Sequence, residues 1–426
     1  MKLKISRAYG ARLFLLLVTV ACCLFQFMLH RQCETFREYE AAFLSLQSLV
    51  MACLGFWCAS FIWLTFNRQD LPLIGLLIIA IGFRFLDQAV NPSRDALTLL
   101  AGVTLGKGAR FALKSGNWKA DKGNFFVGLI IMLAFAAWWR LDMSGNYYSG
   151  PRWMGLWDNP NTYGMLMGAG VTLAIGLLAA SLKSNVQRPK LEKVKIIFLS
   201  VAIFMLGVGL VMSYSRGAWL ATAIGLLYLA WCYGKLKWKY VAIGAGCVAL
   251  AAGLLWGGTA DSAPWYLKRA DLGRPSAQHR ATAWRAGLEI MRDYPLGVGW
   301  NNAIRIYGEK YHPPEGGPAA ITTNDYMILG TELGIPALLC FVVYVGLCYR
   351  KGPRPLIPAF SPGGGEGVRR TDEGEALRAA CLAGALVFVV AFWFDGGLFK
   401  LPTAALFWVL LELGSSAVPV RHCVKN

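Results

Sequence analysis

Long apolar runs recur along the chain and limit what it can fold into, as at 71–83, 161–182 and 196–213. A helix of about 20 such residues spans the hydrocarbon core of a bilayer. Of the 426 residues, 56% are hydrophobic and only 15% are charged, whereas a soluble domain usually has about 25% charged residues. We therefore predict an all-α polytopic membrane protein.

We expect about twelve transmembrane helices, joined by loops that alternate between the two sides of the membrane. The expected spans are 12–30, 41–66, 71–90, 95–106, 124–139, 161–182, 196–213, 217–234, 240–257, 326–349, 379–394 and 398–413. The first nine form a bundle within 1–257, and the last three lie within 326–426. The Gly-rich stretch 352–374, inside a linker of 350–378, predicts a flexible cytoplasmic segment.

Lys and Arg set the orientation of these helices, because cytoplasmic loops carry an excess of both residues. With the N-terminus in the cytoplasm, most of the 42 Lys and Arg fall on the cytoplasmic side, among them Lys107 and Arg110 in the loop after the fourth span. This distribution accounts for the net charge of +18, so we expect no nucleic-acid partner. The first span lacks a small-residue cleavage motif, and we expect no removable signal peptide.

The longest polar stretch, 258–325, separates the ninth and tenth expected spans. It holds eight Lys or Arg and two of the four His. The orientation places this stretch on the outer face of the membrane, where long loops tolerate positive charge. We predict a large, mostly helical outer loop, and we expect any chemistry to lie here and in the spans that flank it.

The segment 276–294 of this loop predicts a helix. Arg285 lies on one face of that helix, whereas Arg280 shares another face with Trp284, Leu288 and Met291. A bare charge on an apolar face is unfavourable, which favours a buried anion as the partner of Arg280. The alternative is an amphipathic helix that lies on the membrane surface.

Two polar turns at the outer ends of spans are further candidates. In the first, Ser-Tyr-Ser-Arg-Gly, the guanidinium of Arg216 matches phosphate oxygens and keeps its proton; the alternative is an interfacial Arg that extends toward lipid headgroups. In the second, Trp-Asp-Asn-Pro-Asn, Asn159 and Asn161 precede a span. Asn161 or Thr162 is suited to cap that helix, and polar groups at a helix N-terminus also bind an anion or sugar hydroxyl groups.

A third polar cluster lies where the loop meets the tenth span. Thr323, Asn324 and Asp325 stand at the outer end, Tyr326 follows, and Glu332 is about two turns deeper. Motifs for nucleotide, metalloprotease, redox-dithiol or serine-hydrolase chemistry are absent from the sequence. None of the eleven Cys falls within 258–325. We therefore expect neither a metal nor a cofactor.

The order and spacing of these motifs resemble the O-antigen ligase and O-antigen polymerase superfamily. The resemblance covers about 157–339 and comprises WDNPNTYG, SRGAWLA, an Arg-x-x-x-Trp helix at Arg280 and Trp284, PLGVGW, and an Asn-x-Tyr motif from Asn324 that ends in Glu-x-Gly. Each motif alone is weakly specific. Their order, together with about twelve spans and one large outer loop, is more specific.

The resemblance implies a glycosyltransferase of the bacterial inner membrane with its active site on the periplasmic face. It would transfer a glycan from an undecaprenyl-diphosphate carrier to a hydroxyl group of a glycan or lipid A-core acceptor, with inversion and without a metal. Diphosphate binding would fall to Arg216, Arg280 and Arg285. Contacts with the glycan would come from Asn159, Asn161, Trp284, Asn324 and Tyr326.

The sequence departs from the ligase pattern at Thr323, where the ligases have a His immediately before the Asn. A Thr hydroxyl is a poor base near neutral pH. We expect Asp325 to accept the proton of the acceptor, with His312 as the second choice and Glu332 and Glu315 as further candidates. Otherwise this protein works without a base or is inactive.

Two other functions compete with this one. A transporter or flippase of lipid-linked oligosaccharide would need charged residues along a path through the spans, and few are present: Arg84, Asp87, Glu332 and Lys400. An oligosaccharide transferase that modifies proteins would differ only in its acceptor.

Overall fold

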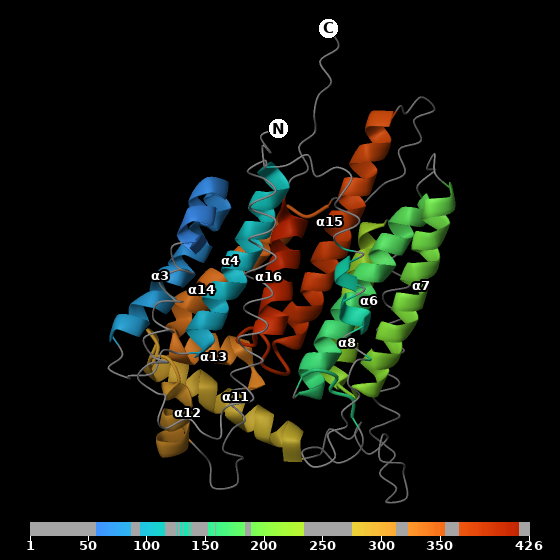
Figure 1. Cartoon of the computed structure of the whole chain (residues 1–426). Coiled ribbons are helices and arrows are strands. Elements are labelled where there is room, and N and C mark those ends of the chain that lie inside the picture. The colour runs from blue at the N-terminus through green and yellow to red at the C-terminus, as the bar shows by residue number, and fades with distance from the viewer. Residues whose placement is uncertain are drawn as a thin grey trace, which may run out of the picture. The chain divides into compact units, whose positions relative to one another are not determined.

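The computed structural model describes residues 57–86, 94–115, 126, 128–130, 132–135, 138, 152–157, 159–183, 189–233, 275–311, 323–353 and 366–416. Within these residues every secondary-structure element of three or more residues is a helix (Figure 1), which confirms the all-α class. The chain divides into two compact units, each assembled from separate segments. Unit 1 comprises 1–122, 284–351 and 392–416, and unit 2 comprises 123–283, 352–391 and 417–426.

Unit 1 contains most of the shorter helices. They are η2 (Arg68–Asp70), α3 (Leu71–Leu86), α4 (Arg94–Ser115), α12 (Asn302–Ile306), η3 (Tyr307–Tyr311), α13 (Asp325–Glu332), α14 (Gly334–Arg350) and α16 (Leu401–Ser415). Helix α4 packs along α16, and α14 packs against both α3 and α16. Helix α11 (Pro275–Asp293) is divided between the units after Ala283.

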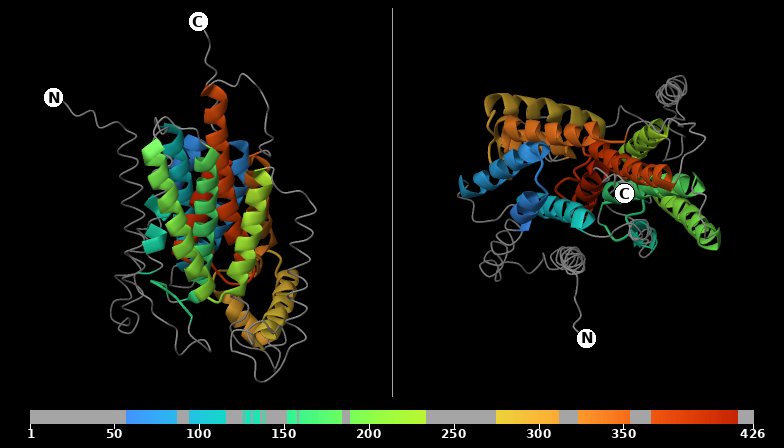
Figure 2. Two further views of the ribbon diagram at one scale, coloured as in Figure 1. Left: turned by 90° about the vertical axis from the view of Figure 1, so that its right-hand side faces the viewer. Right: turned by 90° about the horizontal axis from the view of Figure 1, so that it is seen from above.

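Unit 2 contains α6 (Pro160–Lys183), α7 (Pro189–Met212), α8 (Arg216–Cys232) and α15 (Glu366–Ala391), shown from a second side in Figure 2. Helix α6 contacts the other three. The apolar segment of α6 that is long enough to span a membrane is 72% buried, whereas the corresponding segment of α7 is 28% buried. The exposed apolar side chains of α7 include Ile197, Val201 and Phe204. This face of α7 is suited to contact lipid, whereas α6 is mostly buried within the unit.

Among the described residues, three helices are long and apolar enough to cross a membrane: Pro160–Leu182, Lys193–Met212 and Gly374–Ala391. They agree with three of the expected spans, and the protein is a membrane protein. The structure describes two shorter apolar helices as well, Gly334–Arg350 and Leu401–Ser415. The expected spans 12–30 and 240–257 lie outside the described residues, so the total of about twelve stays a prediction.

Three expectations about helix boundaries were wrong. The fourth span does not end at 106, because α4 continues to Ser115 and includes Lys107 and Arg110. The tenth span is not one helix but two, α13 and α14. The expected linker 352–374 is helical from Glu366 onward, where its Glu and Arg residues favour a helix.

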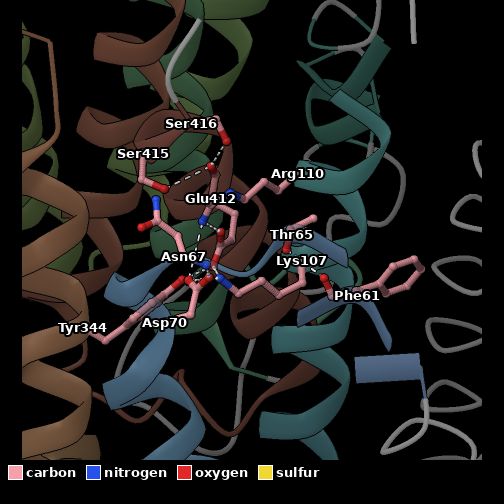
Figure 3. A network of polar contacts seen from close by, with 10 residues as sticks. All are labelled: Phe61, Thr65, Asn67, Asp70, Lys107, Arg110, Tyr344, Glu412, Ser415 and Ser416. Carbon is pink, nitrogen blue, oxygen red and sulfur yellow. Dashed lines mark hydrogen bonds and ion pairs between the residues drawn. The ribbon is translucent and has the colours of Figure 1, made fainter. Parts of the chain in front are cut away.

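Lys107 and Arg110 are buried because carboxylates from two other elements neutralise them (Figure 3). The Lys107 Nζ lies 2.7 Å from Asp70 Oδ1 and 2.8 Å from Glu412 Oε1. The Arg110 Nη1 lies 3.1 Å from Glu412 Oε2 and 3.6 Å from Asp70 Oδ1. All four side chains are at most 4% exposed. We call these four residues the charge quartet.

Tyr344 of α14 adds a neutral partner to the charge quartet. Its hydroxyl accepts a hydrogen bond from Lys107 Nζ at 2.8 Å and donates one to Glu412 Oε1. The quartet and Tyr344 therefore connect η2, α4, α14 and α16 within unit 1. Two positive and two negative charges balance, which is the condition under which ionised groups persist in a protein interior.

We predict that Lys107→Met strongly destabilises the protein, because it leaves two buried carboxylates with one cation. Removing one partner of a buried ion pair costs about 3–5 kcal/mol. Thermal unfolding in detergent measures the effect, with Lys193→Met on the exposed side of α7 as the matched control. The double variant Lys107→Met/Asp70→Asn restores the charge balance and should recover part of the loss. Equal melting temperatures for Lys107→Met and the wild type would contradict this prediction.

The break between α13 and α14 is built by two glycines that meet across the fold. Gly334 has φ +87° and Gly297 has φ +92°, a region that favours glycine. A Cβ on Gly334 would overlap the backbone of Leu296. Backbone hydrogen bonds from Val298 N to Thr331 O and from Gly299 N to Glu332 O, both 2.9 Å, join the two segments. The Pro-Leu-Gly-Val-Gly turn thereby fixes where α13 ends.

We expect Gly334→Ala to destabilise this junction, whereas Gly346→Ala on the same helix should be tolerated. The left-handed backbone alone costs a non-glycine residue about 1–3 kcal/mol, and the overlap with Leu296 adds to that cost. A Cβ on Gly346 meets nothing within 4 Å, and alanine favours a helix interior. Comparative melting temperatures in the same detergent test the pair. Equal melting temperatures for the two variants would contradict the role of Gly334 in the break between α13 and α14.

Candidate active site

Asn324 begins the first cluster of candidate residues, at the N-terminus of α13 in unit 1. Its side-chain Oδ1 accepts hydrogen bonds from Tyr326 N at 3.0 Å and Met327 N at 3.2 Å. Asn324 is thus the N-cap of α13, a position that its residue type favours. The side chain is fully buried, and its Nδ2 has no hydrogen-bond partner among the described residues.

Asp325 follows and is held by the chain segment between α15 and α16. Its backbone N donates to Phe392 O at 3.0 Å. Its Oδ2 accepts from Gly397 N at 2.7 Å and from Leu398 N at 2.8 Å. The side chain is 1% exposed, and Oδ1 has no partner among the described residues. One oxygen of this carboxylate is therefore fixed, and the other is left to act on a proton.

Burial changes the acidity of Asp325, which precedes the apolar helix α14. Loss of solvation raises the pKa of Asp325 to about 7, against the opposing effect of the two backbone N–H donors. Among side chains, Lys400 lowers that pKa and Asp395 raises it. A carboxylate with this pKa exchanges its proton near neutral pH, as a general base must.

Three aromatic side chains surround the same helix end. The ring of Trp393 lies 5.6 Å from that of Trp284 on α11 and 5.5 Å from that of Tyr326 on α13, between ring centroids. Trp393 is 41% exposed. Two further buried polar atoms lack partners here among the described residues, Trp284 Nε1 and Asp395 Oδ2. We call Trp284, Asn324, Asp325, Tyr326, Trp393 and Asp395 the cap cluster.

The structure brings together four predicted residues in the cap cluster: Trp284, Asn324, Asp325 and Tyr326. Trp393 and Asp395 were not predicted. The available signal was the sequence Trp-Phe-Asp-Gly-Gly between two apolar runs, which places an acidic residue in a glycine turn at the end of a span. Glu332 occupies the other end of the eight-residue α13. There the backbone N–H of Asn301 donates to its carboxylate.

The second group of candidates belongs to unit 2 and surrounds the start of α8. Arg216 is the first residue of that helix, and its side chain is exposed. The side chain of Ser215 caps the helix by accepting from Ala218 N at 3.4 Å. An exposed Arg at a helix N-terminus adds its charge to that of the helix dipole, so this end attracts anions.

Arg152, a residue that was not predicted, fixes the turn next to α8. Its Nε donates to Ser213 O at 2.7 Å, and its Nη2 donates to Asn161 Oδ1 at 2.6 Å. It is 3% exposed, although no sequence signal distinguished it from a surface Arg. Asn159 Oδ1 accepts from Asn161 N at 2.7 Å. The predicted pair Asn159 and Asn161 therefore lies beside the turn that leads to Arg216.

Helix α11 carries the remaining predicted Arg residues. Its buried face contains Ala283, Ile290 and Met291, whereas Leu288 is 57% exposed. Of the face expected to be buried, Met291 is buried, whereas Leu288 is exposed, and the expectation for Leu288 was wrong. Arg280 is half-buried and Arg285 is exposed, so neither needs a buried counter-ion.

Three other predicted candidates have less structural context. Thr323 is half-buried in the turn before Asn324. His312 and Glu315 lie outside the described residues. In the described part of the chain, no group of three or more His, Cys, Asp or Glu side chains could hold a metal ion.

Comparison with known proteins identifies part of the chain. The family model described as O-Antigen ligase matches residues 201–342. That range includes Arg216, α11, the Pro-Leu-Gly-Val-Gly turn and α13. No curated protein matched the chain. A domain of this family indicates glycosyl transfer of the O-antigen ligase or polymerase type. Residues 201–342, about one third of the chain, therefore match the O-antigen ligase family, and this match supports the resemblance to the O-antigen ligase and polymerase superfamily.

Proposed function

We propose that this protein transfers a glycan from an undecaprenyl-diphosphate carrier to an acceptor hydroxyl group at the periplasmic face of the bacterial inner membrane. The observation that carries the proposal is Asp325, a buried carboxylate with one oxygen fixed by two backbone N–H groups and one without a partner. It lies inside the O-antigen ligase domain, two positions after Thr323. The acceptor is a glycan or lipid A-core.

The donor diphosphate binds Arg216 in this proposal. The guanidinium is exposed at the N-terminus of α8, where the helix dipole also favours negative charge. Arg280 and Arg285 contribute further positive charge on α11. As the bond between C1 of the sugar and the diphosphate oxygen breaks, negative charge grows on the leaving diphosphate. Fixed cations stabilise that charge more in the transition state than in the ground state.

Asp325 acts on the acceptor. Its Oδ1 takes the proton of the acceptor hydroxyl group while the acceptor oxygen forms a bond to C1 from the side opposite the diphosphate. The electron pair of the broken bond leaves with undecaprenyl diphosphate, and the configuration at C1 inverts. The two N–H donors hold Oδ2 in place, so the carboxylate is oriented before the acceptor arrives. Asp325 thus supplies the base that Thr323 cannot.

Arg216→Ala should reduce glycan transfer about 100-fold or more, as loss of one transition-state donor does. Arg292→Ala, at an Arg whose side chain is 86% exposed on α11, is the matched control and should retain activity. The readout is the attachment and length of surface glycan on a gel, in cells that lack the native gene. Normal glycan in Arg216→Ala cells would refute the proposal.

Asp325→Asn should lower kcat by about 10²–10⁴-fold, the usual contribution of a general base. The amide keeps the size of the side chain and an oxygen to accept the two N–H donors. For the wild type, kcat should rise with pH and level off above about 7, because the Asp325 carboxylate must lose its proton to act. Glu289→Gln, at an exposed carboxylate of α11, is the control. A wild-type kcat that does not change between pH 5 and 9 would argue against Asp325.

Transport of a lipid-linked oligosaccharide is the alternative function, and the charge quartet favours it in one respect. The quartet adds four ionisable side chains to the interior of unit 1. These groups pair with one another, however, whereas a transport path needs groups that exchange partners. Transfer of glycan by the purified protein between purified donor and acceptor would exclude this alternative. Deletion of the gene identifies the surface glycan or glycoprotein that depends on it.

A further inference from the structure

The cap cluster combines aromatic faces with partnerless polar atoms, and this combination has a specific binding chemistry. A pyranose ring has an apolar face of C–H groups and an edge of hydroxyl groups. Its C–H face packs on the electron-rich face of an aromatic ring, and each hydroxyl group both donates and accepts hydrogen bonds. We propose that the cap cluster is the binding site for the terminal sugar ring of the acceptor. The identification of this sugar as the acceptor rests on the proposed function, whereas the binding of a sugar ring does not.

Trp393 provides the stacking surface. It is 41% exposed, although Trp284 and Tyr326 both contact it. The T-shaped contact with Trp284, at an interplanar angle of 68°, directs one ring edge toward the other ring. Trp393 is thereby fixed by its neighbours while part of its surface stays accessible. A rigid, partly exposed aromatic side chain binds at low entropic cost.

The polar atoms of the cap cluster that lack protein partners among the described residues are suited to hydrogen-bond with the hydroxyl groups of a pyranose. Trp284 Nε1 and Asn324 Nδ2 are donors, and Asp325 Oδ1 and Asp395 Oδ2 are acceptors. Asn324 and Asp325 are at most 1% exposed, and buried polar atoms in native proteins are normally paired. Two donors and two acceptors at one helix end therefore point to a ligand that offers both kinds of group, as a sugar does.

The charge of the cap cluster distinguishes a neutral sugar from the donor diphosphate. Two carboxylates, Asp325 and Asp395, act on each other here, and Lys400 is the cation that acts on Asp325. A diphosphate next to two carboxylates would be repelled. The hydroxyl group of a bound sugar would instead lie beside Asp325, which removes its proton. The sugar ring at this site consequently belongs to the acceptor, whose hydroxyl group is the nucleophile, and not to the donor.

Saturation-transfer NMR on the full-length protein in nanodiscs tests the site directly. The probes are methyl α-D-glucopyranoside, methyl β-D-galactopyranoside and methyl α-L-rhamnopyranoside, with saturation of the aromatic protons of the protein. At least one probe should receive saturation from the wild type. Trp393→Ala should reduce the signal at least about fivefold, and Trp393→Phe should keep it because a ring face remains. Inorganic diphosphate should not displace the bound probe.

Two further variants separate a binding role from a folding role. Trp63→Ala removes a Trp that is 84% exposed outside the cap cluster and should leave the signal unchanged. Asp395→Asn keeps the size of the side chain but weakens a charge-assisted hydrogen bond, so the signal should fall while the melting temperature holds. If no probe receives saturation, or if Trp393→Ala and Asp395→Asn both keep the wild-type signal, the sugar site is refuted.

Kinetics with purified donor and acceptor test the assignment to the acceptor. Trp393→Ala should raise the KM for the acceptor about tenfold and leave the KM for the donor unchanged. A raised KM for the donor alone would overturn the assignment. This outcome is distinct from failure of the proposed function, which Arg216→Ala tests: normal glycan in those cells would refute glycan transfer and leave a sugar site measured by NMR intact.

Discussion

A cation inside a helical membrane protein needs a compensating partner, and in unit 1 two carboxylates fill this role. Asp70 and Glu412 arrive from η2 and α16, and both cations come from α4. All four groups are removed from water, so a shift of any one element would leave a charge uncompensated. Apolar core positions tolerate exchanges of side chains that conserve volume, whereas these four positions require opposite charges in contact. The ion pairs therefore set the register of these helices more strictly than the core around them.

The proposed chemistry uses two local environments with opposite properties. Arg216 stands exposed at a helix N-terminus, where an anion is favoured. Asp325 is buried, and the loss of solvation makes its carboxylate a stronger base than one in water, against the opposing effect of its two backbone N–H donors. One fold can thus stabilise a leaving anion and accept a proton at the same pH, because environment separates the two tasks. Both residues belong to the O-antigen ligase domain.

Sequence reasoning succeeded where local pattern carries the information. Apolar run lengths located α6 and α7, and the polar residues Asn324 and Asp325 were recognised at a helix start. It failed for Lys107, which the positive-inside rule assigned to a cytoplasmic loop. Its partners Asp70 and Glu412 are far away in sequence, and no local pattern indicates that a Lys will meet them. Asp395 did lie in a recognisable glycine turn, but its neighbours on α13 come from a distant segment, and the turn alone does not indicate that they meet.

Helix α16 lies between the cap cluster and the charge quartet. Gly397 and Leu398, just before the helix, hold the carboxylate of Asp325, and Glu412 near its other end belongs to the charge quartet. Its residues span about 22 Å at 1.5 Å each. We expect a displacement of Glu412 to reach Gly397 and Leu398 through this helix. Glu412 variants would therefore lose activity because the carboxylate of Asp325 is displaced, although Glu412 does not touch the substrate. Measurements of kcat and KM would be needed to distinguish Glu412 from a residue that contacts the substrate.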